Sequence, residues 1–312
     1  MQNLVTRDSL LIIYYMKKLF YLAWWFFGAR VLGRKRPLQT VLFIGDKCNL
    51  KCRHCAVYAR ENPNIMTYEQ VREQLRYAHS LGSRFVDFEG GEVMLWRDGD
   101  YRINDLIDLA KEEGFFSATI TTNAQLPFKG SKADSIWVSL DGIGDYHEYI
   151  RGKGTFKRLE ENIASCGHKH LSVNMVVSTY NYEAVVPTIE YAKNNPAIEK
   201  ISINFYTPFP GSETSMVLDK QKRIEVIDKV IEMKKKGYPI MNSVSGLKLM
   251  KENKFKRRCW VTNFIYADGT RSGCAGEGLN ICDECGLCMA GEMNSVFNFK
   301  IDTIFAGLKL RL

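Results

Sequence analysis

Beyond residue 38, short apolar runs alternate with longer segments in which apolar residues recur every three or four positions. Short apolar runs predict buried strands, and the longer spacing predicts helices that pack on them. The expected strands lie near residues 41–44, 84–88, 115–122, 135–140, 171–178 and 200–205, and the expected helices near residues 67–81, 103–113, 156–165, 184–193 and 218–236. This alternation is typical of βα units, so the sequence predicts an α/β fold with a parallel sheet.

The first of these helices has recognisable start and stop signals. Thr67, followed three residues later by Gln70, predicts a capping box at its N-terminus. Gly82 stands directly after the last helical position, Leu81.

The N-terminal segment is strongly apolar at residues 10–13 and 19–29, with Lys17 and Lys18 between the two runs. The longer run has 11 residues, whereas a membrane-spanning helix needs about 20. It is rich in aromatic residues, which favour the membrane–water boundary. Four basic residues follow it: Arg30, Arg34, Lys35 and Arg36. We therefore expect residues 1–37 to form an interfacial anchor that holds the protein peripherally at the cytoplasmic face of a membrane. The alternative is a helix that packs on the main domain or in a dimer interface.

Composition narrows the class of protein. The chain has 312 residues, 46% of them hydrophobic and 25% charged, as in globular proteins. Its formal net charge of +8 favours anionic partners without choosing among them. Nine cysteines form two clusters, at residues 48–55 and 259–288, with Cys166 alone between them. Such clusters are typical of reduced, metal-binding cysteines in the cytoplasm.

The first cluster is Cys48, Cys52 and Cys55, directly after the apolar run 41–44 and Gly45. Four-iron clusters are held by cysteine thiolates, and three thiolates leave the fourth iron open to bind a substrate. Two other interpretations fit the spacing: three cysteines on one face of a helix that are simply core, or a zinc site.

The segment resembles the radical S-adenosylmethionine (SAM) superfamily, in which three cysteines with this spacing follow the first strand of a partial (β/α)6 barrel. His54 fills the position before the last cysteine, which is usually aromatic in that family. Gly90-Gly91-Glu92, after the next strand, resembles the family's GGE motif, which holds the amino group of SAM. The resemblance covers residues 38–210 and implies a core barrel over 38–240, with Cys48, Cys52 and Cys55 as its catalytic centre.

The same resemblance implies further SAM-contacting residues at the ends of later strands, where the active sites of parallel barrels lie. Ser139-Leu140-Asp141-Gly142, followed by His147 and Arg151-Gly152, resembles the family's SLDG…H…RG stretch. Together with His54 and the GGE motif, the implied cofactor-binding residues are Asn123, Ser139, Arg151 and Asn174. Asn204 and Tyr206 end the last expected strand and would line the same pocket.

The second cysteine cluster occupies the C-terminal region, residues 241–312. Its members are Cys259, Cys274, Cys282, Cys285 and Cys288. The region resembles the SPASM or twitch extension of some radical SAM enzymes, although it has too few cysteines for two fully ligated clusters. The resemblance implies one auxiliary [4Fe-4S] cluster, held by Cys282, Cys285 and Cys288 with either Cys259 or Cys274. A zinc site with four cysteine ligands is the alternative.

The function implied is an enzyme that reductively cleaves SAM to a 5′-deoxyadenosyl radical. Its cofactors would be a [4Fe-4S] cluster, SAM and the auxiliary cluster, and its partner a one-electron donor of the flavodoxin or ferredoxin type. The N-terminal segment favours a membrane lipid or isoprenoid substrate, as in the lipid-modifying members that join adenosyl to hopanoid precursors. A peptide maturase is the second hypothesis, and a non-enzymatic iron–sulfur or zinc protein that docks at a membrane is the third. No nucleic-acid partner is expected.

Overall fold

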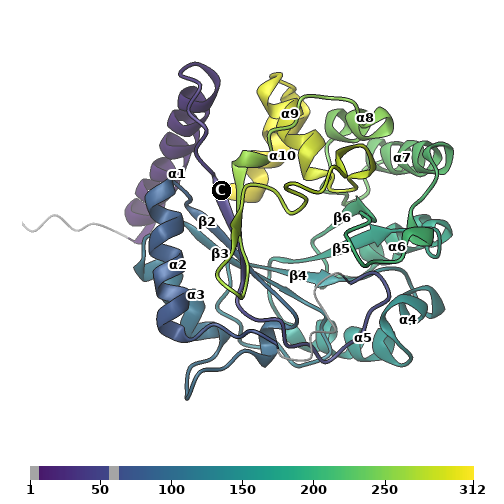
Figure 1. The fold of residues 1–312 in the computed structure, drawn as a ribbon, viewed down its shortest axis with the longest axis horizontal. Coiled ribbons are helices and arrows are strands. Elements are labelled where there is room, and N and C mark those ends of the chain that lie inside the picture. The colour runs from purple at the N-terminus through teal and green to yellow at the C-terminus, as the bar shows by residue number, and fades with distance from the viewer. Residues whose placement is uncertain (1–6, 56–62) are drawn as a thin grey trace, which may run out of the picture.

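A computed structural model describes residues 7–55 and 63–312, so residues 1–6 of the expected anchor lie outside the described part. Its centre is one curved sheet with the strand order β6-β5-β4-β3-β2-β1-β7-β8 (Figure 1). The strands are β1 (Gln39–Phe43), β2 (Phe85–Glu89), β3 (Ser117–Thr122), β4 (Ser135–Ser139), β5 (Leu171–Val177), β6 (Lys200–Phe205), β7 (Thr262–Ile265) and β8 (Arg271–Ser272). All neighbours are parallel except β7 and β8.

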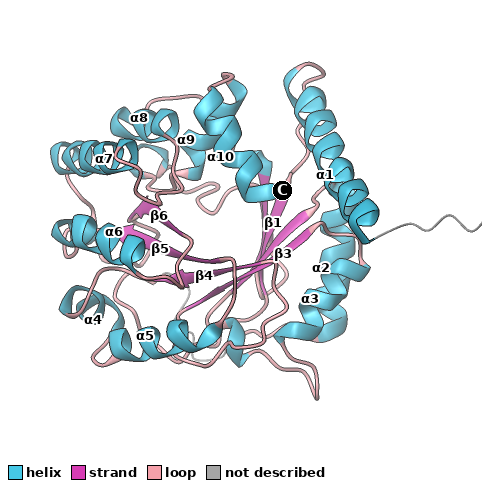
Figure 2. Cartoon of the chain, turned by 180° about the vertical axis from the view of Figure 1, so that it is seen from behind, coloured by secondary structure: helices cyan, strands magenta, loops and turns pink. Residues whose placement is uncertain are grey.

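The α-helices surround this sheet (Figure 2). They are α1 (Arg7–Arg30), α2 (Tyr68–Leu81), α3 (Ile103–Glu112), α4 (Asp145–Arg151), α5 (Thr155–Cys166), α6 (Val185–Asn194), α7 (Lys220–Lys235), α8 (Val244–Glu252), α9 (Met289–Phe297) and α10 (Ile301–Arg311). The predicted α/β fold with a parallel, partial barrel is confirmed, and β1 to β6 are the six expected strands.

The C-terminal region adds two strands that the sequence did not predict. β7 pairs in parallel with β1, with Thr262 opposite Gln39, and β8 pairs antiparallel with β7. The expected boundary at residue 241 therefore does not separate two sheets, because the C-terminal region completes the one begun by the barrel. β7 has 4 residues and β8 has 2, so both are too short to show an alternation of apolar and polar residues in the sequence.

The capping box that the sequence predicts for α2 is present. The Thr67 side chain accepts a hydrogen bond from the Gln70 backbone, and the Gln70 side chain accepts one from the Thr67 backbone. Gly82 ends the helix in the left-handed conformation, with φ of 117°. Both ends are therefore fixed by local residues alone.

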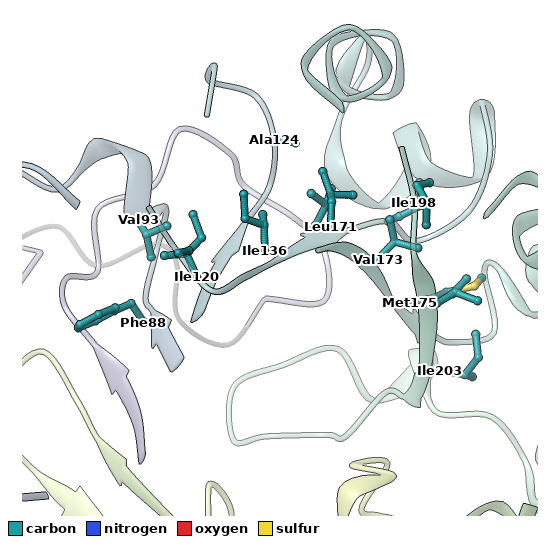
Figure 3. Close-up of a cluster of buried hydrophobic side chains, with 14 of the residues drawn as sticks. Phe88, Val93, Ile120, Ala124, Ile136, Leu171, Val173, Met175, Ile198 and Ile203 are labelled. Atoms are coloured by element: carbon teal, nitrogen blue, oxygen red, sulfur yellow. The ribbon is translucent and has the colours of Figure 1, made fainter. Parts of the chain in front are cut away.

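Alternate residues of the strands face opposite sides of the sheet. One row across the sheet is apolar, with Phe88 opposite Ile120, Ile120 opposite Ile136, and Ile136 opposite Leu171. These side chains are fully buried and form the main core (Figure 3). The neighbouring row, displaced by one residue, is polar: Asp87 pairs with Thr119 and Thr119 with Ser135. The sheet thus has an apolar helix-facing side and a polar inner side.

Helix α1 closes the end of the barrel where the strands begin. Trp25 packs in a second apolar cluster whose other buried members are Leu38, Phe85, Phe116, Val261 and Phe297. Tyr14 donates its hydroxyl hydrogen to the Phe116 carbonyl at 2.6 Å, and Trp25 Nε1 donates to the Arg36 carbonyl at 2.9 Å. Among the described residues, no helix is both long and apolar enough to cross a membrane.

The two adjacent tryptophans of α1 test this packing. Trp25 is 8% exposed and Trp24 is 55% exposed. We expect Trp25→Ala to lower the free energy of unfolding by about 3–5 kcal/mol, because it empties a packed site. Trp24→Ala is the matched control, with an expected change within about 0.5 kcal/mol. Urea denaturation of both variants measures the difference, and equal effects would show that α1 does not pack through Trp25.

Candidate functional site

The cysteine loop is fixed to the end of β2 by backbone contacts. Ile44 N donates to the Glu89 carbonyl at 2.9 Å, Gly91 N to the Gly45 carbonyl at 2.8 Å, and Glu92 N to the Lys47 carbonyl at 2.9 Å. These bonds extend the β1–β2 pairing past the last residue of each strand. The chain therefore enters the loop at Cys48 along a fixed path.

Gly90 and Gly91 are glycines because the two backbones approach so closely. A Cβ on Gly90 would lie 2.3 Å from the Gly45 carbonyl oxygen, and one on Gly91 would lie 2.2 Å from that of Lys47. Gly90 also has a φ of 149°, which other residues rarely adopt. The backbone of the cysteine loop thus occupies the space that a side chain at either position would need.

The thiols of the loop face hydrogen-bond donors from several elements. Cys48 Sγ accepts from Leu50 N at 3.4 Å and from Asn123 Nδ2, just beyond β3, at 3.7 Å. Cys52 Sγ accepts from Arg151 Nη1, at the end of α4, at 3.9 Å. Burial raises the pKa of Cys52 to about 11, with Arg151 opposing the rise and Asp141, Cys55 and Cys48 adding to it.

This arrangement fits an iron–sulfur cluster. Burial raises the pKa values of Cys48 and Cys52, so a cationic group bound in the loop would be needed to hold these two as thiolates. The donors around them are those that stabilise anionic sulfur. In addition, His54 Nδ1 and His147 Nε2 are buried and find no hydrogen-bond partner among the described residues. A ligand bound beside the cysteines would offer these two nitrogens a hydrogen-bond partner.

Asp141 is the centre of a buried network that sequence reasoning did not assign. Its Oδ2 accepts from Arg151 Nε at 2.6 Å and lies 3.3 Å from His54 Nε2, while Val176 N donates to Oδ1 at 2.9 Å. Burial alone would raise the pKa of Asp141, but the Arg151 guanidinium outweighs it, helped by the hydrogen bond from Val176 N, and the pKa stays below its usual value. In the sequence, only the place of Asp141 in the SLDG motif could have indicated this role.

The two histidines of this network are neutral. Burial lowers the pKa of His147 to about 3, and it also lowers that of His54. His147 Nδ1 accepts from the backbone N–H of Asp141 at 3.2 Å. The charges beside Cys52 are therefore the Asp141 carboxylate and the Arg151 guanidinium.

Glu92 has partners within the chain. Its carboxylate accepts from Thr122 Oγ1 at 2.7 Å, from Asn123 N at 2.7 Å and from Met94 N at 3.1 Å. It thereby ties the GGE turn to the end of β3. Its contact with the SAM ammonium group stays a prediction.

The other predicted residues line the ends of β4, β5 and β6. Ser139 lies opposite Asn174 in the sheet, and Asn204 Nδ2 donates to Asn174 Oδ1 at 2.8 Å. Asn204 Oδ1 in turn accepts from the backbone of Cys288 at 2.9 Å. A continuous polar row therefore joins the expected SAM site to the C-terminal cysteines.

Three of the C-terminal cysteines, Cys259, Cys274 and Cys285, line one cavity. A hydrogen bond between the first two lowers the pKa of Cys274 to about 6 and raises that of Cys259. Cys288 is fully buried, and Cys282 is exposed. The structure thus places both candidates for the fourth ligand, Cys259 and Cys274, beside Cys285.

The Cys285–Cys288 turn is held against the end of β6. Gly286 N donates to Thr207 Oγ1 at 2.9 Å, and a Cβ on Gly286 would lie 1.8 Å from the Phe205 carbonyl oxygen. Arg223 donates to the Cys285 carbonyl at 3.0 Å. The Arg223 guanidinium therefore places a positive charge beside Cys285, as a second iron–sulfur cluster with anionic thiolate ligands would require. Nowhere in the described residues do three cysteine, histidine or carboxylate side chains converge on a single metal ion.

Comparisons with known proteins agree with this geometry. The family model described as the Radical SAM superfamily matches residues 42–192, the stretch that contains the three cysteines, the GGE turn and Arg151. Residues 42–192 of this chain therefore form a radical SAM domain.

Two curated relatives are 28% identical to this chain. The Fe-coproporphyrin III synthase of Methanosarcina barkeri matches over 260 residues, which cover 71% of this chain and 63% of the relative. The GTP 3′,8-cyclase of Clostridium botulinum matches over 203 residues, which cover 58% of this chain and 59% of the relative. The chain therefore spans about six tenths of the length of these relatives.

Among solved structures, SuiB of Streptococcus suis bound to S-adenosylmethionine has a TM-score of 0.62 at 20% identity, covering 87% of this chain and 66% of SuiB. SuiB bound to its precursor peptide SuiA is similar at a TM-score of 0.61 and 21% identity, covering 82% of this chain and 64% of SuiB. At this level of identity the likeness establishes the fold.

The close approach at Gly91 gives a prediction with a matched control. We expect Gly91→Ala to lower the free energy of unfolding by about 1–3 kcal/mol, because its Cβ overlaps a backbone oxygen that cannot move alone. Gly307→Ala in α10, where nothing lies within 4 Å of the added Cβ, should raise stability by up to about 1 kcal/mol. Denaturation of both variants checks the two signs. A Gly91→Ala protein as stable as the parent would contradict the backbone contact.

Glu89, on the inner side of β2, gives a pH prediction. Burial, with Asp87 adding to it and Thr121 opposing it, raises the pKa of Glu89 from its ordinary 4.5 to about 7. The folded protein thus binds the Glu89 proton more tightly than the unfolded protein does. This proton binding stabilises the fold fully below pH 4.5, and the stabilisation is lost as the pH rises through 7. We expect the unfolding free energy of the parent, relative to Glu89→Gln, to fall by up to about 3 kcal/mol across this window. Denaturation at pH 4.5, 6 and 8 measures it, and a constant difference would contradict the shift.

Proposed function

We propose that this protein reductively cleaves SAM at a [4Fe-4S] cluster held by Cys48, Cys52 and Cys55. The observation that carries the proposal is the loop itself. Its three thiols lie within electrostatic reach of one another, where the strands of the barrel end, and Arg151 and Asn123 donate to two of the sulfurs. A cluster bound there would supply the one-electron reduction of SAM, with the electron coming from a flavodoxin- or ferredoxin-type donor, that splits SAM into methionine and a 5′-deoxyadenosyl radical able to attack the substrate.

The chain's own residues position the reactants and keep water away. Arg151 places a positive charge beside Cys52, and Asp141 holds its guanidinium in one orientation. Asn123 links the Cys48 sulfur to the end of β3. Ser139 and Asn174 stand side by side on the inner face of the sheet, where they would contact SAM.

An auxiliary [4Fe-4S] cluster is the second part of the proposal. Cys259, Cys274 and Cys285 share one cavity and would supply three ligands, and Cys282 or Cys288 the fourth. The cavity lies beside the turn that is bonded to the end of β6, so the second cluster would stand next to the polar row of Asn174 and Asn204.

We propose a membrane-associated lipid or isoprenoid as the substrate. Its support is the N-terminal helix, whose outer face exposes large apolar side chains. A peptide is the second candidate. It is favoured by the likeness to SuiB, which has been solved with its precursor peptide. A comparison of lipids and of modified peptides from cells with and without the gene decides between the two.

Iron content and SAM cleavage test both clusters. We expect the anaerobically reconstituted protein to hold about eight irons and to form 5′-deoxyadenosine with SAM and dithionite. Replacing Cys48, Cys52 and Cys55 by Ala should remove half the iron and all of the cleavage.

Replacing Cys259, Cys274 and Cys285 by Ala should remove the other half of the iron. This variant should still cleave SAM when no substrate is present. Cys166→Ala is the control and should retain all the iron. Zinc in the C-terminal site would refute the auxiliary cluster only, whereas a parent protein that forms no 5′-deoxyadenosine would leave a non-enzymatic binding protein.

A further inference from the structure

Helix α1 has two apolar faces, and the barrel covers only one of them. The stripe that packs on the barrel contains Tyr14, Tyr21 and Trp25, which contact Phe116 before β3 and Phe297 of α9. Trp25 is buried and Tyr21 is half-buried, whereas Tyr14 is 37% exposed. The adjacent stripe recurs at the same helical spacing and is exposed: Ile13 60%, Phe20 73%, Trp24 55%, Phe27 44% and, directly after the helix, Val31 64%. Contiguous exposed apolar surface of this kind marks an interaction site.

Helix α10 extends this surface from the other end of the chain. Phe299, just before α10, packs against Phe26 of α1 with ring centroids 5.6 Å apart and is 57% exposed. Ile301 and Phe305 follow along α10 and are 69% and 59% exposed. Phe299 thus brings the start of α10 next to α1, while α10 itself packs beside α8 and α9 (Figures 1 and 2).

Basic residues predominate around this surface, where Asp302 in the first turn of α10 is an exposed acidic residue. No aspartate or glutamate occurs from Ser9 to Gly45. Six basic residues lie in that stretch: Lys17, Lys18, Arg30, Arg34, Lys35 and Arg36. All of these except Lys18 are exposed. Lys300 directly precedes α10, and Lys309 lies in its last turn. A second copy of the chain would bring basic residues against basic residues, whereas an anionic bilayer complements them.

We propose that the exposed faces of α1 and α10 form a docking platform for the surface of an anionic lipid bilayer. The aromatic residues of the platform enter the boundary between headgroups and acyl chains, and the basic residues bind the headgroups. The helix lies on the membrane and does not cross it. This proposal is independent of the proposed chemistry, because none of its residues contacts the cysteine loop.

Flotation of the full-length holoenzyme with vesicles tests the platform. The probes are phosphatidylcholine vesicles with and without 30% phosphatidylglycerol (a chosen composition). We expect binding to the anionic vesicles at low salt, only partial release at high salt, and weaker binding to phosphatidylcholine alone, because salt screens the charges and leaves apolar burial unchanged.

The double variant Phe20→Glu/Trp24→Glu should weaken binding at least tenfold while retaining iron and 5′-deoxyadenosine formation. Lys229→Glu on α7 is the matched control, because it changes the net charge by the same two units at an exposed site across the molecule (Figure 1). Phe305→Glu should weaken binding by itself and so test the part that α10 plays.

Three outcomes would overturn the proposal. The parent could remain unbound in the presence of anionic vesicles, or the double variant could bind as tightly as the Lys229→Glu control. Sedimentation equilibrium could also show that the double variant converts a dimer to a monomer without a change in vesicle binding, which would assign the surface to a second copy. Loss of iron from the parent, with vesicle binding intact, would instead refute the proposed chemistry alone.

Discussion

The contact on which the site depends joins two stretches of backbone, residues 45–47 and Gly90–Gly91. Two hydrogen bonds of 2.8 and 2.9 Å hold them together, and neither glycine has room for a Cβ. The position of the cysteine loop is therefore set by main-chain geometry and not by the packing of side chains. Glu92 extends the same constraint to the end of β3, so that the ends of three strands move as one unit.

Electrostatics adds the second constraint. Asp141 and Arg151 form a buried ion pair, and burying such a pair costs more than its attraction returns unless further hydrogen bonds satisfy it. Val176 supplies one of these bonds, and the neutral His54 adds a further polar neighbour. The pair is better understood as a positioning device than as a source of stability. It aims one guanidinium at the Cys52 sulfur, where the protein most needs positive charge.

The features that the sequence predicted are those encoded by neighbouring residues. The capping box of α2 needs only Thr67 and Gln70, and β6 has the predicted bounds, with Ile201, Ile203 and Phe205 alternating with polar residues. The cysteine loop and the GGE turn are likewise contiguous. Features that join distant segments were missed. The pairing of β7 with β1, the network of Asp141 and the meeting of Cys259 with Cys285 are decided by tertiary packing, which no local period records.

The two faces of α1 show why its sequence allowed two interpretations. A helix that is apolar all round has no polar stripe, whether it is buried or lies on a membrane. In the structure the packed-helix alternative holds for the Trp25 face, while the Trp24 face remains for the proposed bilayer. One helix can therefore close the barrel and carry the anchor, and neither role excludes the other.

The position of α1 also places the proposed membrane-docking platform far from the SAM site. It packs where β1, β2 and β3 begin, whereas the cysteine loop and the GGE turn lie where these strands end. Strands of 5 residues span about 16 Å, so the two sites stand at opposite ends of the barrel. A protein docked through α1 and α10 would hold its SAM site away from the bilayer. A lipid substrate would then have to extend its reacting group past the barrel, whereas a peptide or another soluble substrate would reach the site directly. Membrane docking, once measured, will thus not by itself identify a lipid as the substrate.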